Sequence, residues 1–127
     1  ELADEIASSP EIVATGFVSD AEKAAIVRHA TVMVNPSHLE SLSLLMLEAM
    51  ASRVPVLVNG RSEVMADHCR RSGAALAAAA AISSQLRRLL SSPQLRRELG
   101  EKGPAYVREQ YGWEVIIPKL RRLIDSL

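Results

Sequence analysis

The sequence has little of several features that would point to particular classes of protein. It holds a single cysteine, Cys69, which excludes an internal disulfide and is typical of proteins kept in a reducing cytoplasm. Aromatic residues make up only 3% of the chain, and fifteen basic residues balance fifteen acidic ones, so nothing indicates a nucleic-acid partner. No apolar run approaches the ~18 residues of a membrane-spanning helix. The first residues also lack the pattern of a signal peptide. We therefore expect a cytoplasmic protein with no integral membrane segment.

Two familiar site motifs are also missing. The six glycines form no G-x-G-x-x-G, so the fingerprint of a nicotinamide or flavin site is absent. Asp67, His68 and Cys69 resemble half of a metal site, but zinc needs more ligands and the sequence offers no second cluster. We expect these three residues to form the end of a helix, and we expect no bound metal.

The residues that are present favour one α/β domain. With 127 residues and 48% hydrophobic content, the chain can bury one modest core. Strand-like and helix-like segments alternate along it, as in parallel β/α units. The expected strands are residues 11–15, 32–35, 54–58 and 74–76. The expected helices are residues 19–29, 44–51, 62–70, 82–90, a helix from residue 92, and 113–127. The pattern predicts a parallel sheet flanked by helices, with a helical C-terminus.

Local signals refine some of these boundaries. Ser19 and Glu22 have the spacing of a capping box, and Ser92 precedes a proline at the first position of a helix. Pro104 and Pro118 lie within helical stretches, which they should break or kink. The alanine run at residues 77–81 offers the strand before it little to pack against, so the local structure there is unusual or the residues are not the true sequence.

Glu40 and Glu48 carry the most chemical information in the chain. The expected strand 32–35 ends just before Glu40, and a helix beginning near Ser43 would direct its free N–H groups and positive dipole end toward an anion. In open α/β sheets, ligands bind at such strand-to-helix transitions. Eight residues span roughly 12 Å of helix. Two carboxylates at that separation suit a sugar at one end of a pyrophosphate and a ribose at the other, because they accept hydrogen bonds from hydroxyls.

This segment resembles the E-x7-E motif of the family 4 (group 1) glycosyltransferases, which have two facing Rossmann-like domains, the GT-B fold. The resemblance covers nearly the whole chain and rests on the order and spacing of several landmarks. These landmarks are residues 16–20, 35–37, 40–48, 54–58 and 95–100. A bare pair of glutamates eight residues apart would be common by chance in helical proteins. The resemblance implies that the chain is the C-terminal, donor-binding, Rossmann-like half of such an enzyme, with the first strands missing.

The resemblance also implies roles for particular residues. Glu40 would contact the hydroxyls of the donor sugar, and Glu48 would hold the ribose of the nucleotide. The backbone amides of Ser41, Leu42 and Ser43 would lie against the diphosphate. The family commonly has an aromatic residue at position 42 and glycine at position 43, and Ser43 has a side chain that makes close approach of the backbone less certain.

A loop and a reaction type follow from the same resemblance. Gly16, Phe17 and Val18 match the loop that lies near the nucleobase in this family. The family transfers a hexose with retention of configuration from a nucleotide sugar such as a UDP- or GDP-hexose, and it needs no metal on the diphosphate. Consistent with that, the sequence has no D-x-D pair of the metal-dependent type.

Simpler interpretations of the same residues remain open. In an arbitrary helical protein Glu48 would usually face solvent, although Leu44, Leu45 and Leu47 should leave little of this helix exposed. Glu40 alone would more often complement a helix dipole. A lone loop histidine such as His38 is usually solvated.

The resemblance also implies that the chain is an incomplete functional unit. Residues 1–112 would form most of a nucleotide-sugar-binding domain, and residues 113–127 a helix that packs back toward an N-terminal acceptor domain. That domain, and the upstream arginine and lysine that hold the diphosphate in this family, match nothing here. We therefore expect the chain alone to be inactive, and its uncovered surfaces to favour self-association.

The competing hypothesis is a non-catalytic module that binds a nucleotide or another protein. An upstream coding region of roughly 250 residues would favour the enzyme, because that length accommodates two further α/β units. A reading frame that begins near Glu1 would favour the module.

Overall fold

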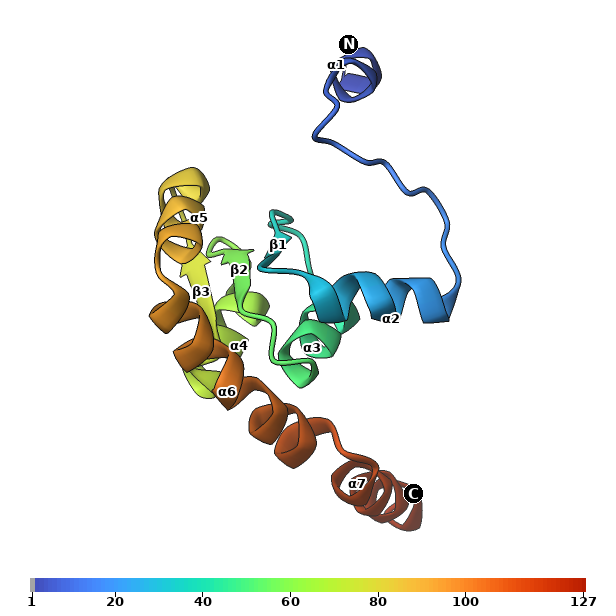
Figure 1. The fold of residues 1–127 in the computed structure, drawn as a ribbon. Coiled ribbons are helices and arrows are strands. Elements are labelled where there is room, and N and C mark those ends of the chain that lie inside the picture. Colours follow the sequence, from blue (N-terminus) through green and yellow to red (C-terminus); the bar gives the residue numbers. More distant parts are fainter. Residues whose placement is uncertain (1) are drawn as a thin grey trace.

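The computed structural model describes residues 2–127, which form a small sheet flanked by helices, with the first and last helices lying away from the sheet (Figure 1). The elements follow one another as α1 (Leu2–Ser8), α2 (Asp20–His29), β1 (Met33–Asn35), α3 (Leu44–Ala51), β2 (Val56–Asn59), α4 (Glu63–Ser72), β3 (Ala75–Ala78), α5 (Ile82–Ser91), α6 (Pro93–Tyr111) and α7 (Trp113–Asp125). Within residues 2–127, every helix is too short or too polar to cross a membrane.

The three strands form one parallel sheet in the order β1-β2-β3. Met33 pairs with Val56, and Val56 pairs in turn with Ala75. Helix α3 connects β1 to β2, and α4 connects β2 to β3, because parallel neighbours need a crossover between them. The predicted class, an α/β protein with a Rossmann-like parallel sheet, flanking helices and a helical C-terminus, is confirmed.

Strand β2 lies at the centre of the sheet and is buried on both faces. Val56 and Val58 pack into a core with Met50 of α3 and residues of α4. Leu57 faces the other way, into a second core with Leu89 and other residues of α5 and α6. Burial on both faces explains why this stretch of the sequence is continuously apolar rather than alternating.

Helix α6 packs closely against α3 through two glycines. A Cβ atom on Gly103 would overlap the carbonyl oxygen of Met50, at the end of α3, and one on Gly100 would overlap that of Arg53. Larger residues at these positions would push α6 away. The close packing of α6 fixes the position of α3, the helix that carries Glu48.

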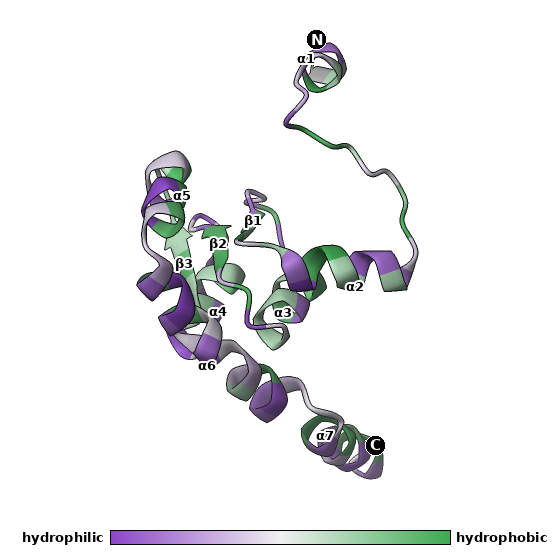
Figure 2. Cartoon of the chain, in the orientation of Figure 1, coloured by the Kyte–Doolittle hydropathy of each residue, from purple (hydrophilic) through white to green (hydrophobic). Residues whose placement is uncertain are grey.

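Residues 11–15 do not form the predicted strand. They run as an extended, exposed segment between α1 and α2, away from the sheet (Figure 1). Figure 2 shows hydrophobic residues along this segment, where Ile12 is 51% and Val13 79% exposed. A strand needs backbone hydrogen bonds to a neighbouring strand, and no hydrogen bond within residues 2–127 joins this segment to the sheet. These residues have the β-propensity of a strand, but they have no neighbouring strand or core to pack against.

Of the predicted break or kink at each internal proline, the break does not occur. Helix α6 continues through Pro104 and α7 through Pro118. Each proline removes one backbone donor and crowds the preceding turn, at a cost of about 3 kcal/mol. In α6 the packing against α3 and α5 offsets that cost.

The alanine-rich segment forms an edge strand, and the unusual local structure that we allowed for is found just after it, where Ala81 has a positive φ of 57°. Strand β3 is longer than predicted, and Ala75 and Ala78 are both buried. The carbonyl oxygen of Ala78 accepts a hydrogen bond from the N–H of Gly60 at 2.9 Å. Alanine side chains are therefore packed here, although we expected this strand to have little to pack.

Helix α7 presents a hydrophobic face to solvent. None of its residues is buried, and Trp113 and Leu123 are 75% and 61% exposed. Figure 2 shows hydrophobic and hydrophilic residues on opposite sides of the helix. The division of the chain at residue 112 and the docking of α7 on another domain stay predictions.

Candidate functional site

The loop between β1 and α3 is organised by Asn35, the last residue of β1. Its side-chain oxygen accepts the N–H of Ser37 at 3.0 Å. Its Nδ2 donates to Oγ of Ser43 at 3.1 Å and to Oε2 of Glu40 at 3.4 Å. One amide at the carboxyl end of a strand therefore holds both the Glu40 carboxylate and the residue that caps α3.

Helix α3 begins where the sequence predicts. Ser43 is its N-cap, and Oγ of Ser43 accepts the N–H of Met46 at 3.2 Å. The first turn contains no acidic side chain. By helix geometry the N–H groups of Leu44 and Leu45 have no partner within the helix, so an anionic ligand could bind them.

Glu40 is half-buried and is tied to a second helix as well. Its backbone carbonyl accepts Oγ–H of Ser62 at 3.3 Å, and Ser62 is the N-cap of α4. Asn59, at the end of β2, donates from Nδ2 to the carbonyl of Pro36 at 2.9 Å. The ends of two neighbouring strands thus fix the loop that carries Glu40, in agreement with its predicted place at a strand-to-helix transition.

Glu48 lies one turn into α3, on the side that faces α2. Its Oε1 accepts a hydrogen bond from Nζ of Lys23 at 3.0 Å, and both side chains are about 40% exposed, at 42% and 40%. Asp20 lies within 3.8 Å of the same ammonium group. The hydrogen bond and negative charge of Glu48 raise the pKa of Lys23, which therefore stays protonated at neutral pH.

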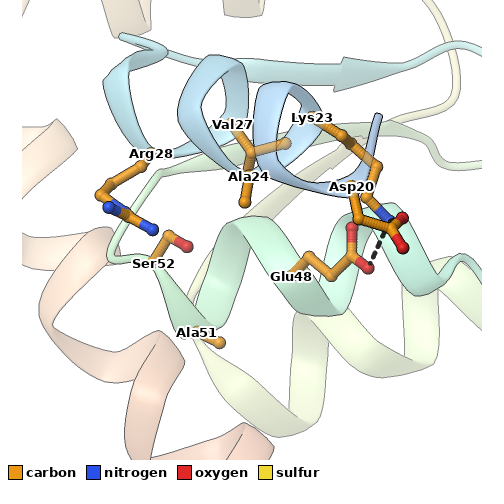
Figure 3. A pocket seen from close by; sticks show the side chains of 8 residues that line it. All are labelled: Asp20, Lys23, Ala24, Val27, Arg28, Glu48, Ala51 and Ser52. Carbon is orange, nitrogen blue, oxygen red and sulfur yellow. Dashed lines mark hydrogen bonds and ion pairs between the residues drawn. The ribbon is translucent and has the colours of Figure 1, made fainter. Parts of the chain in front are cut away.

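A groove of about 540 Å³ runs between α2 and α3. Figure 3 shows Lys23, Asp20 and Glu48 gathered at one end, with Arg28 and Ser52 at the other. The small side chains of Ala24, Val27 and Ala51 line the middle. The groove therefore has an apolar centre between two polar ends.

Ser41 and Leu42 line a different groove, of about 550 Å³, on the side of α4. Its other walls come from α4 and from Tyr111 at the end of α6. Glu48 does not line this groove, and Glu40 and Ser43 line neither of the two grooves, so the structure does not bring the predicted site residues into one hollow. Leu44 and Leu45 are 66% and 42% exposed, so α3 is less covered than we expected.

Within residues 2–127, no hydrogen bond or ion pair joins the predicted nucleobase loop to either glutamate. Gly16 adopts a positive φ of 60°, and Phe17 is fully exposed. Val18 lines an apolar pocket of about 270 Å³ together with Lys23 and residues of α2, β1 and α3. The roles of these three residues stay predictions, as do those of Glu40, Glu48 and residues 41–43.

His68, from the segment that resembles half of a metal site, is part of a buried aromatic cluster. Its Nδ1 lies 2.7 Å from the hydroxyl of Tyr106, and the Tyr111 ring packs beside it. Burial, with a contribution from the charge of Arg71, lowers the pKa of His68. Burial also raises the pKa of the Cys69 thiol to about 11, so it is not a reactive thiolate. Residues 2–127 contain no group of three side chains able to hold a metal ion.

Sequence reasoning missed Asn35 and Lys23 as functional candidates. Asn35 belongs to the landmark at residues 35–37 and ends an expected strand, so its position could have indicated a role in the site. Lys23 gave no signal, because its partner is 25 residues away on another helix.

The comparisons with known proteins agree with this architecture. The family profile described as "Glycosyl transferases group 1" matches residues 1–106, which is most of the chain. No solved structure matches the chain significantly. The match includes the parallel sheet, the loop organised by Asn35 and both glutamates. The chain belongs to the group 1 glycosyltransferases.

Proposed function

We propose that the chain is the donor-binding part of a retaining glycosyltransferase that moves a hexose from a nucleotide sugar, such as a UDP- or GDP-hexose, to an acceptor. The observation that carries this proposal is the position of Glu40. Asn35 holds its carboxylate beside the capped start of α3, where backbone N–H groups can bind phosphate. A carboxylate next to a phosphate site suits a ligand that joins sugar hydroxyls to a diphosphate.

The diphosphate would lie against the start of α3. The amides of Ser41, Leu42 and Ser43 approach it from the loop, and those of Leu44 and Leu45 complete the turn. Glu40 would accept hydrogen bonds from the sugar hydroxyls and Glu48 from the ribose. In this proposal no metal is needed, because the backbone amides of this chain and cations from the remainder of the enzyme would bind the phosphates.

Charge balance indicates that this chain holds only part of the site. Two carboxylates beside a diphosphate repel it, and the helix N–H groups offset that repulsion only in part. We propose that further cations and the acceptor-binding surface come from the remainder of a two-domain enzyme. Closure of the two domains around the donor would exclude water and position the acceptor.

The experiment that tests this proposal compares two glutamate variants in the complete enzyme. Glu48→Ala should weaken nucleotide-sugar binding by roughly 1.5 to 3 kcal/mol, the contribution of a charge-assisted hydrogen bond. Glu40→Gln should instead lower kcat more than nucleotide affinity, because an interaction strengthened in the transition state affects turnover. Glu101→Ala, on the exposed side of α6, is the matched control.

The two variants also define what would contradict the proposal. Unchanged affinity of Glu48→Ala for both nucleotide and donor would remove Glu48 from the ribose. Normal turnover of Glu40→Gln with weakened nucleotide binding would reverse the two roles. If the unaltered complete enzyme turns over no nucleotide sugar, the proposed function is wrong.

A further inference from the structure

The contact between Lys23 and Glu48 joins two helices that are otherwise separate in sequence. The capping box of Ser19 and Glu22 fixes the first turn of α2, which includes Lys23. Close packing against α6 fixes α3, which carries Glu48. Lys23 and Glu48, whose charged groups lie 3.0 Å apart, are therefore both carried by helices with fixed positions.

The pair leaves one oxygen of the Glu48 carboxylate available. Nζ of Lys23 bonds Oε1, and Oε2 has no hydrogen-bond partner within residues 2–127. Glu48 lines the groove between α2 and α3, beside Lys23 and Asp20 (Figure 3). A hydroxyl group could donate to Oε2 without displacing Lys23.

Stability alone does not explain the pair. Ion pairs between half-exposed side chains contribute little to folding, because water screens them and two long side chains must be ordered. The second carboxylate near Lys23, that of Asp20, is 3.8 Å away on a fully exposed side chain, so it competes weakly for the ammonium group. Glu48 is thus the main partner of Lys23.

We propose that Lys23 is a positioning residue for the donor site. This inference rests on the proposed function, because it assigns Lys23 to the ribose contact made by Glu48. Lys23 fixes the rotamer of Glu48 before the ligand arrives, so less conformational freedom is lost on binding. Its ammonium group also offsets the negative charge of Glu48 near the diphosphate.

The test uses donor kinetics of the complete enzyme with Lys23→Met, which keeps most of the length of the side chain and removes the charge. We expect the KM for the donor to rise about tenfold, the size of effect produced by losing a hydrogen bond to a charged group, while kcat changes little. Lys23→Arg should recover part of the loss, because it restores a cation that can bond Oε1. Lys102→Met, an exposed lysine on α6, is the matched control and should leave KM unchanged.

A double-mutant cycle separates positioning from a purely structural effect. In a Glu48→Ala background, Lys23→Met should change the KM no further, because the group that Lys23 positions is already gone. Thermal unfolding checks that each variant stays folded. If Lys23→Met proves unstable, Lys23→Arg and Lys23→Gln carry the same comparison.

Several results would overturn the inference. An unchanged KM for Lys23→Met, or an equal effect in the presence and absence of Glu48, would show that Lys23 does not act through Glu48. A lower KM would show that Lys23 competes with the ribose. If donor binding by Glu48→Ala is still weakened, any of these three results would leave the proposed function intact. An enzyme that used no nucleotide sugar at all would refute both proposals.

Discussion

Replacing Asn35 should damage both the stability of the fold and the donor site. Asn35→Ala removes three hydrogen bonds, to Ser37, Ser43 and Glu40, at 3.0, 3.1 and 3.4 Å. A net contribution of about 1 kcal/mol for each of the two shorter hydrogen bonds, and less for the long one, gives a loss of roughly 2 to 3 kcal/mol. The loop would also lose the group that holds the Glu40 carboxylate near α3.

The assay for stability is urea unfolding of this 127-residue chain. A loss of this size should lower the midpoint of unfolding without changing the slope, because the surface exposed on unfolding stays the same. In the complete enzyme, the same variant should lower kcat more than it raises the KM for the donor, because Glu40 is proposed to act on the sugar.

Asn35→Asp is the informative companion variant because it is nearly the same size. It keeps an oxygen that can accept the N–H of Ser37, but it loses both donated bonds and places a second carboxylate beside Glu40. It should be at least as unstable as Asn35→Ala at neutral pH and should recover when the carboxylates are protonated. If both variants unfold at the unaltered midpoint and turn over normally, Asn35 does not organise the loop.

Two further predictions concern the chain by itself. It should neither transfer nor hydrolyse a nucleotide sugar. It should also bind UDP-glucose or GDP-mannose with a Kd no lower than millimolar, because an exposed helix terminus contributes only about 0.3 to 1 kcal/mol per charge contact. Micromolar binding in a calorimetric titration would contradict this prediction. Because burial lowers the pKa of His68, the unfolded chain should bind a proton that the folded chain does not, so stability should be full above about pH 6.5 and fall as the pH drops through the lowered pKa. His68→Gln should flatten this pH dependence in urea unfolding, and an unchanged profile would show that His68 does not cause it.

The parts of the fold that sequence predicted well are those set by local interactions. Helix α2 begins at the capping box of Ser19 and Glu22, and both reciprocal hydrogen bonds are formed. Helix α6 begins with Ser92 as N-cap and proline at its first position. These signals involve residues three positions apart, so the sequence alone contains them.

Strands depend on partners that a local pattern does not reveal. Residues 54–58 were recognised because strand β2 is buried on both faces and so reads as a continuous apolar run. Residues 11–15 also contain β-branched residues but pair with nothing in the described chain. The same limit applies to the site, where the position of Glu40 follows from a strand-to-helix transition, whereas the partner of Glu48 depends on how α2 packs beside α3.

The different partners of the two glutamates give a physical reason for different roles. A neutral amide holds Glu40, so its carboxylate keeps its full negative charge toward a ligand. Glycosyl transfer passes through a transition state in which positive charge develops on the sugar. An uncompensated carboxylate stabilises that charge more than it stabilises the ground state, and so raises kcat.

An ammonium group partners Glu48, which offsets its charge locally. A ribose is neutral throughout the reaction, so a compensated carboxylate can accept its hydroxyl while repelling the nearby diphosphate less. Loss of this contact should affect ground state and transition state equally, and therefore KM rather than kcat. The pairing of one glutamate with an amide and the other with a lysine thus supports assigning Glu40 to the sugar and Glu48 to the ribose.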